Sequence, residues 1–137
     1  MTISSIYLNL PVRDIQATRT FWAALGFGFN EKFSDEKALC LELNPPVIYA
    51  MLLETAFFKT FTDKPVSDGS TAAALLSIQV ESRARVDELV ALAVASGARR
   101  YGEAMDHGWM YFDRFEDLDG HQWEVMYADE SLIPETP

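Results

Sequence analysis

The sequence predicts an α+β fold built from two βαβββ repeats, and three observations support this prediction. A strand-like run followed by a helix-like run occurs near the start of the chain and again near its middle. Val12 and Val80 occupy corresponding places in these runs, as do Asp14 and Ser82, so the repeats are offset by 68 residues. Three short strand candidates then follow each helix, which gives the order βαβββ twice.

The first repeat, residues 1–54, opens with the run SIYLNLPV at 5–12, whose apolar residues alternate as in a half-buried strand. Asp14 is typical of a helix N-cap, the apolar spacing over 15–25 predicts a helix, and Gly26 is typical of the residue that ends one. The strand candidates that follow are residues 27–33, 37–43 and 47–54.

A connector, residues 55–71, reads TAFFKTFTDKPVSDGST and predicts a short helix or loop with an aromatic patch. The second repeat, residues 72–137, begins with a predicted strand over 73–80. Ser82 is the expected N-cap of a helix over 83–96, which Gly97 ends. The strand candidates that follow are residues 98–102, 109–116 and 121–127.

We expect the two repeats to form one domain, residues 1–137. Each repeat has about half of the chain and only one long helix. A unit of that size can hardly bury a sufficient core by itself. The prediction is therefore a single domain made of two halves.

The strand alternation also assigns the side chains to faces. In each repeat, one face of the first strand is apolar and suits packing under the helix, whereas the opposite face is mixed. The mixed positions are Tyr7, Asn9, Leu75, Ser77 and Gln79. A mixed face suits a pocket wall and equally suits an interface or a partly solvated surface, so both interpretations stay open.

Composition excludes several classes of partner. The net charge of −10 argues against a nucleic-acid or anionic-membrane partner, which would need a basic face. Apolar runs are too short to span a membrane, and the N-terminus lacks the pattern of a signal peptide. Cys40 is the single cysteine and fits a small buried hydrophobe, and we expect a reducing, cytoplasmic location.

Two stretches, LPVRDIQATRTFWAALGF and FEDLDGHQWEVMY, resemble the vicinal oxygen chelate superfamily. This group contains glyoxalase I, extradiol dioxygenases, fosfomycin-resistance enzymes and bleomycin-binding proteins. The resemblance covers nearly the whole chain and is strongest to uncharacterised lactoylglutathione-lyase-like proteins. Leu118 departs from the pattern, since this turn usually has proline. The resemblance implies that the two βαβββ repeats form a cupped mixed sheet with helices on its outer face.

The resemblance also implies where a metal would bind, because metal enzymes of this superfamily draw ligands from the first and last strands of each half. Carried over, the first ligand falls on Tyr7, the third on Leu75 and the fourth on Glu124, while the second falls on Tyr49 or Met51. Only the glutamate is a good ligand for zinc, nickel or manganese. We therefore expect the scaffold without the metal chemistry, with no metal and no cofactor.

The two histidines do not supply the missing ligands. His107 lies in the loop MDHGW, and His121 follows Gly120 at a predicted hairpin turn. Neither has a second histidine or acid at ligand spacing on the same strand face. We interpret both as surface loop residues.

The role of Glu124 depends on the register of the last hairpin. A three-residue loop with Gly120 in the left-handed conformation pairs Asp117 with His121 and Arg114 with Glu124. Glu124 is then either held by Arg114 or presented to a pocket as a hydrogen-bond acceptor or general base. We favour the pairing, and both roles can hold together if the pair lies at a pocket wall.

The function predicted from these observations is the metal-independent binding of a partly hydrophobic small organic molecule, or an unassigned metal-independent enzymatic activity. The predicted pocket residues are Tyr7, Tyr49, Met51, Leu75, Met126 and Arg114, with Glu124 as the candidate catalytic residue. One alternative is a metal-dependent enzyme of the lactoylglutathione lyase or dioxygenase type, and another is an interaction module. Whether the protein is an enzyme stays open, because a fold does not fix a function.

The connector also predicts an assembly. Phe57, Phe58 and Phe61 place three aromatic rings within five positions, and each ring gains roughly 1.5–3 kcal/mol by burial. We expect the second half of the chain or a second chain to cover them. Because superfamily members commonly pair βαβββ units, the resemblance implies a homodimer.

Overall fold

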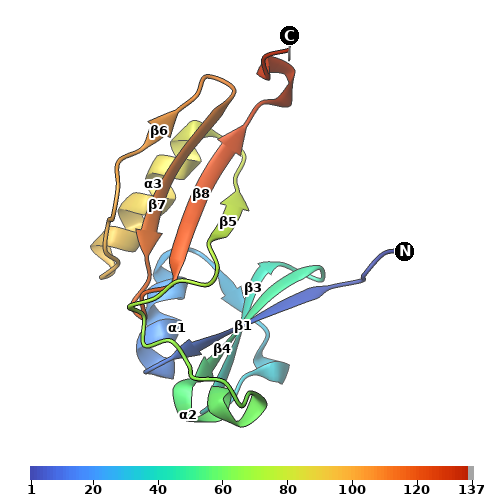
Figure 1. Ribbon diagram of the computed structural model, residues 1–137, viewed down its shortest axis with the longest axis vertical. Coiled ribbons are helices and arrows are strands. Elements are labelled where there is room, and N and C mark those ends of the chain that lie inside the picture. Colours follow the sequence, from blue (N-terminus) through green and yellow to red (C-terminus); the bar gives the residue numbers. More distant parts are fainter. Residues whose placement is uncertain (136–137) are drawn as a thin grey trace. The chain divides into compact units, whose positions relative to one another are not determined.

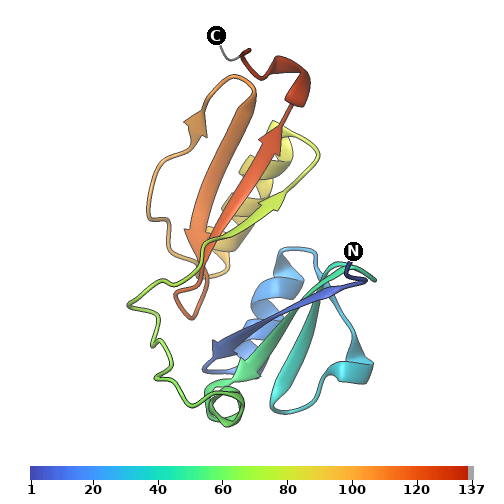
Figure 2. The same cartoon turned by 45° about the vertical axis from the view of Figure 1, so that its right-hand side comes forward.

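The computed structural model describes residues 1–135 and confirms the α+β class with two βαβββ repeats. The chain divides into two compact units, residues 1–67 and the part that begins at Asp68, and each contains one four-stranded mixed sheet. In each unit one long helix covers a single face of the sheet (Figure 1; Figure 2). That the two units make up one domain stays a prediction.

The first unit has the strand order β1-β4-β3-β2, with β1 parallel to β4 and the other neighbours antiparallel. Its connector forms a turn of helix and a 3₁₀ turn next to β4. The elements are β1 (Ile6–Val12), α1 (Ile15–Ala24), β2 (Gly28–Phe29), the 3₁₀ helix η1 (Glu31–Phe33), β3 (Ala38–Asn44), β4 (Ile48–Glu54), α2 (Thr55–Phe58) and η2 (Lys59–Phe61).

Helix α1 begins and ends where the sequence indicates. The Asp14 carboxylate accepts a hydrogen bond from the Ala17 N–H at 3.0 Å, which satisfies a backbone donor in the first turn. After the helix, Gly26 adopts a φ of 94°, a conformation that favours glycine. Phe21 and Trp22 are buried, so the helix covers the face of the sheet that carries Leu52.

The second unit repeats this arrangement with the strand order β5-β8-β7-β6 and β5 parallel to β8. The Ser82 hydroxyl accepts from the Arg85 N–H at 3.0 Å, as expected for the N-cap of its helix. The elements are β5 (Leu76–Gln79), α3 (Arg83–Ala95), β6 (Met105–Asp106), β7 (Met110–Glu116), β8 (Gln122–Ala128) and the 3₁₀ helix η3 (Glu130–Leu132). The buried core under α3 consists of Val86, Leu89, Val90, Ala93, Phe115, Trp123 and Val125.

Three predicted strands differ from the observed ones. The strand expected over 27–33 is only Gly28–Phe29, because the Asn30 side chain accepts from the Lys32 N–H and starts η1. The strand expected over 98–102 is absent, and only one bridge joins Arg99 to Glu116, so β6 comes later in the chain. The strand expected from residue 73 begins at Leu76.

A buried carboxylate organises the β7–β8 hairpin. Asp117 is 8% exposed and accepts from the N–H groups of Asp119 and His121 and from the indole N–H of Trp123, at 2.9, 3.0 and 3.0 Å. The Asp117 N–H donates to the His121 carbonyl, and Gly120 has a φ of 85°. This confirms the predicted loop and places Arg114 directly opposite Glu124.

We predict that Asp117→Ala lowers the free energy of unfolding by roughly 2–4 kcal/mol, because it leaves three buried or half-buried donors without their acceptor. Denaturant unfolding would measure the change. Asp63→Ala is the matched control, since Asp63 is exposed and should change stability by no more than about 0.5 kcal/mol. Equal stability of the two variants would contradict the role given to Asp117.

Candidate functional site

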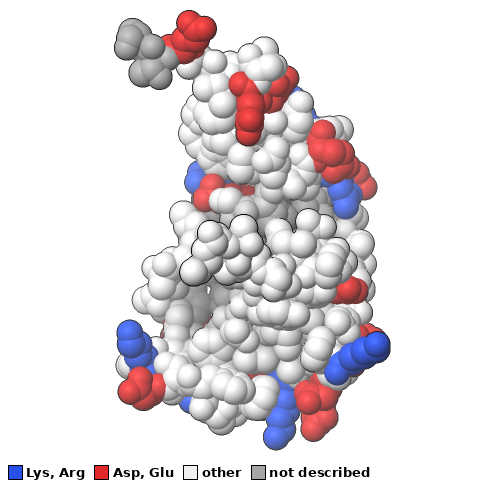
Figure 3. Space-filling model, turned by 90° about the vertical axis from the view of Figure 1, so that its right-hand side faces the viewer, with Lys and Arg blue, Asp and Glu red and all other residues white. Residues whose placement is uncertain are grey.

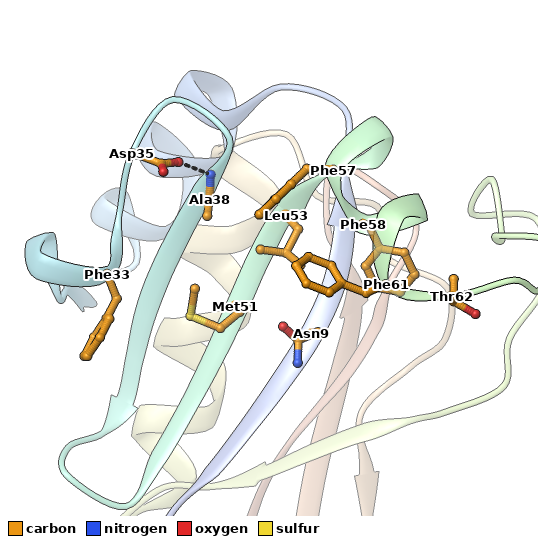
Figure 4. Close-up of a pocket in the computed structure, with 10 residues that line it drawn as sticks. All are labelled: Asn9, Phe33, Asp35, Ala38, Met51, Leu53, Phe57, Phe58, Phe61 and Thr62. Atoms are coloured by element: carbon orange, nitrogen blue, oxygen red, sulfur yellow. Dashed lines mark hydrogen bonds between the residues drawn. The ribbon is translucent and has the colours of Figure 1, made fainter.

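A pocket lies on the face of the first sheet opposite α1. The strands contribute Asn9 from β1, Ala38 from β3, and Met51 and Leu53 from β4, which are cross-strand neighbours on one face. The α2–η2 turn stands beside them and supplies aromatic rings (Figure 4). The cavity has a volume of about 660 Å³ and is lined by Asn9, Phe33, Asp35, Ala38, Met51, Leu53, Phe57, Phe58, Phe61 and Thr62.

Phenylalanines form much of the pocket wall. The rings of Phe57 and Phe61 pack edge to face with 5.0 Å between their centres. Phe57 and Phe58 are half-buried, whereas Phe61 is 69% exposed, so this single chain does not cover all three connector rings as expected. Their burial by a second chain stays a prediction. Phe33 of η1 is also exposed and borders the same cavity.

Few polar groups enter this pocket. Asp35 is turned to its own loop, where one carboxylate oxygen accepts from the N–H groups of Lys37 and Ala38 at 2.8 and 3.0 Å (Figure 4). The Asn9 amide donates only a long 3.5 Å hydrogen bond to the Tyr7 carbonyl. The lining can therefore accept an apolar body and offers the Asn9 amide to a polar group on it.

Two predicted pocket residues form a stacked pair on the same sheet face. Tyr7 and Tyr49 are in register on β1 and β4, one step along the face from Asn9 and Met51, and their rings lie 4.8 Å apart and nearly parallel. Burial raises the pKa of the Tyr49 phenol, and the neighbouring Tyr7 adds to the increase. Tyr49 is therefore a neutral, largely covered ring beneath the more exposed Tyr7.

The residues at the four inferred metal positions do not fit a divalent metal. The first unit supplies Tyr7 and either Tyr49 or Met51, and the second supplies Leu75 and Glu124. Leu75 lies before β5, is 58% exposed and has no donor atom in its side chain. Residues 1–135 contain no group of three His, Cys, Asp or Glu side chains placed to hold a metal ion.

The other predicted site residues share one face of the second sheet. Arg114 and Glu124 are directly paired across β7 and β8, and Met126 is paired with Phe112 two residues away. Among the described residues, however, neither a hydrogen bond nor an ion pair joins Arg114 to Glu124. The register was predicted correctly, but the expected ion pair was wrong.

Aromatic rings contact the Arg114 guanidinium instead. Its central carbon lies 5.3 Å from the ring centre of Tyr101 and 5.9 Å from that of Phe112. Burial raises the pKa of the Tyr101 phenol, and the nearby Glu124 carboxylate raises it further, whereas the Arg114 guanidinium lowers it. Tyr101 is therefore near both charged groups.

Gly102 makes this position of Arg114 possible. A Cβ atom at Gly102 would lie 2.4 Å from two guanidinium nitrogens of Arg114. The buried Nε of Arg114 has no hydrogen-bond partner within residues 1–135. An unpaired buried donor costs about 1–3 kcal/mol, which makes Arg114 a candidate for a functional rather than a structural role.

Sequence reasoning missed several residues that border these sites. Phe112 could have been predicted, because a residue two positions from Arg114 in a strand lies on the same face. Phe33, Asp35 and Thr62 come from turns whose position near a sheet face has no local signal. The histidines lie where expected: His107 precedes β7 and stacks near Phe112, and His121 follows the hairpin turn.

No helix within residues 1–135 is both long and apolar enough to span a membrane. The buried thiol of Cys40 agrees with the predicted small hydrophobe, and burial raises its pKa.

Solved structures show the same fold in other proteins. A hypothetical protein from S. aureus is 24% identical, with 93% of this chain and 96% of that chain covered and a TM-score of 0.78. A glyoxalase/bleomycin resistance protein/dioxygenase family enzyme from Burkholderia phytofirmans is 20% identical, with coverages of 89% and 96% and a TM-score of 0.73. A glyoxalase-related enzyme from Fulvimarina pelagi is 17% identical, with coverages of 93% and 88% and a TM-score of 0.78.

Among curated proteins, none is significantly similar to this chain. The family model described as the Glyoxalase/Bleomycin resistance protein/Dioxygenase superfamily matches residues 5–125, which cover most of both repeats and include Glu124. The chain therefore belongs to the glyoxalase/bleomycin resistance protein/dioxygenase superfamily.

Proposed function

We propose that this protein binds a small, partly hydrophobic organic molecule and does so without a divalent metal. The observation that carries the proposal is the first-unit cavity of about 660 Å³, whose lining is mainly aliphatic and aromatic. Small-molecule sites are typically about 300–1,000 Å³ and combine an apolar lining with a few polar groups. Asn9 supplies such a group at this cavity.

The residues expected to contact the ligand keep their proposed roles. Tyr7, Tyr49 and Met51 extend the apolar face of the first sheet. On the second unit, considered by itself, we propose Met126, Arg114 and Leu75 as ligand-binding residues. Glu124 then acts as a hydrogen-bond acceptor, or as a general base if the protein is a metal-independent enzyme.

A metal-dependent lactoylglutathione lyase-like or dioxygenase-like enzyme is the alternative. It would need ligands that Tyr7 and Leu75 do not provide, because phenol is a poor ligand for these metals and a leucine side chain has no donor atom. An interaction module is a further alternative, and no observation on the described residues favours it over ligand binding.

The distribution of surface charge also bears on the class of partner. On the face drawn in Figure 3, Lys and Arg side chains lie singly beside Asp or Glu side chains, and no basic patch gathers there. This supports a small-molecule partner over a nucleic acid, which selects basic surfaces. We further propose a single-domain protein that works as a cytoplasmic homodimer, with the connector phenylalanines near the shared surface.

We predict that a thermal-shift screen of aromatic and aliphatic compounds will find ligands that Phe61→Ala weakens roughly tenfold, as expected for loss of one contacting aromatic side chain. Because Phe61 is largely exposed, the substitution should change unfolding little. Ile3→Ala is the matched control, since Ile3 is exposed and lies outside the cavity. Ligands whose affinity falls equally in both variants, or a screen without any ligand, would contradict the proposal.

We predict that the purified protein holds no stoichiometric zinc, nickel or manganese. The reason is the donor set, in which one carboxylate stands alone among the four family positions. Elemental analysis after dialysis, without chelator in any buffer, would measure the metal content. Close to one equivalent of metal per chain that Glu124→Gln removes would show that the metal-dependent alternative is correct.

A further inference from the structure

Arg114 is exceptional among the arginines of this acidic chain. Five other arginines have carboxylate partners within 3.2 Å, namely Arg19, Arg83, Arg85, Arg99 and Arg100. Arg114 is half-buried, yet within residues 1–135 its side chain has neither an ion pair nor a hydrogen bond. In a protein of net charge −10, a half-buried guanidinium without a carboxylate partner is available to an anion from outside the chain.

The surroundings of Arg114 fix its orientation. Tyr101 and Phe112 place rings near its central carbon, and Gly102 leaves room for the guanidinium where any Cβ would collide with it. The buried Nε has no hydrogen-bond partner within residues 1–135. The two terminal nitrogens also make no hydrogen bond with these residues, but they are not fully buried. A planar pair of donors held in this way matches the geometry of a carboxylate.

Glu124 limits which carboxylates can bind. It lies directly across from Arg114 on the same sheet face, with Ser77 as its neighbour on β5. Its carboxylate likewise makes no hydrogen bond with residues 1–135. A simple carboxylate near Arg114 would be repelled by Glu124. A carboxylate whose adjacent carbon bears a hydroxyl or amine would bind Arg114 and also donate to Glu124.

We propose that this face of the second sheet binds the head group of a small organic acid that carries a hydroxyl or amine beside its carboxylate. Arg114 binds the carboxylate, Glu124 accepts from the neighbouring donor, and Tyr101 and Phe112 flank the site. The proposal rests on the proposed small-molecule function and adds the chemical class of the ligand. All of these residues belong to the second unit.

The test compares three phenyl compounds by calorimetry and by NMR of the Arg114 Nε–H signal. Mandelate has both groups, phenylacetate lacks the hydroxyl, and benzyl alcohol lacks the carboxylate. We expect mandelate to bind tightest and to shift the Nε–H signal. Arg114→Met should weaken mandelate tenfold or more, since a charge-assisted hydrogen bond is lost. Arg114→Lys should restore only part of the affinity, because the paired donors are missing.

Three further variants separate the contributions of the site. Glu124→Ala should abolish the preference for mandelate over phenylacetate, because the acceptor for the hydroxyl is gone. Gly102→Ala should displace the guanidinium and weaken mandelate, because a Cβ there would lie 2.4 Å from two of its nitrogens. Arg19→Met is the matched control, because Arg19 is paired with Glu31 in the first unit and its loss should leave mandelate affinity within twofold.

Several outcomes would overturn the proposal. Equal mandelate affinity in the wild type and Arg114→Met would do so, as would benzyl alcohol binding as tightly as mandelate. Failure of both acids to bind at millimolar concentration would also reject it. If neutral compounds still bind and remain sensitive to Phe61→Ala, this proposal fails while the proposed function stands. Circular dichroism of each variant would exclude loss of the fold as the cause.

Discussion

The buried carboxylate of Asp117 is the constraint on which the second sheet depends. This carboxylate accepts hydrogen bonds from two backbone N–H groups and from the Trp123 indole N–H, and these bonds fix the turn. The turn then fixes the register of β7 and β8. A slip of one residue would move every side chain of a strand to the other face. The position of Arg114 opposite Glu124 therefore follows from an interaction at the end of the hairpin, although burial raises the pKa of Asp117 and so opposes its charged form.

The segment before β6 completes the environment of Arg114. Arg99 pairs with Glu116, and Arg100 pairs with the buried Asp113, so two consecutive arginines attach the segment to β7. The chain then passes Tyr101 and Gly102 over the guanidinium of Arg114 instead of continuing as a strand. Because those carboxylates already have basic partners, they are not available to neutralise Arg114. Arg114 therefore has no carboxylate partner because the neighbouring carboxylates bind Arg99 and Arg100.

Local signals account for what could be predicted from the sequence. The N-caps Asp14 and Ser82 and the turn at Gly120 are each recognised from a few adjacent residues, and they established both repeats and the pairing of Arg114 with Glu124. The contact of Gly102 with Arg114 could not be predicted, because it depends on two segments approaching in space. The prediction of an ion pair for Arg114 was wrong for the same reason. Register fixes which residues are neighbours, but the guanidinium lies near the ring of Tyr101, which comes from outside the hairpin.

The two sheets carry different chemistry. The first sheet has a stacked tyrosine pair, and the second has Glu124 directly opposite Arg114. An arginine resembles a metal ion in one respect, since it binds and orients an oxyanion through a permanent positive charge. It differs in another, because it offers no open coordination position at which a water molecule could be activated. An acid bound by Arg114 in the proposed site is therefore oriented by a permanent charge, without a metal-bound nucleophile.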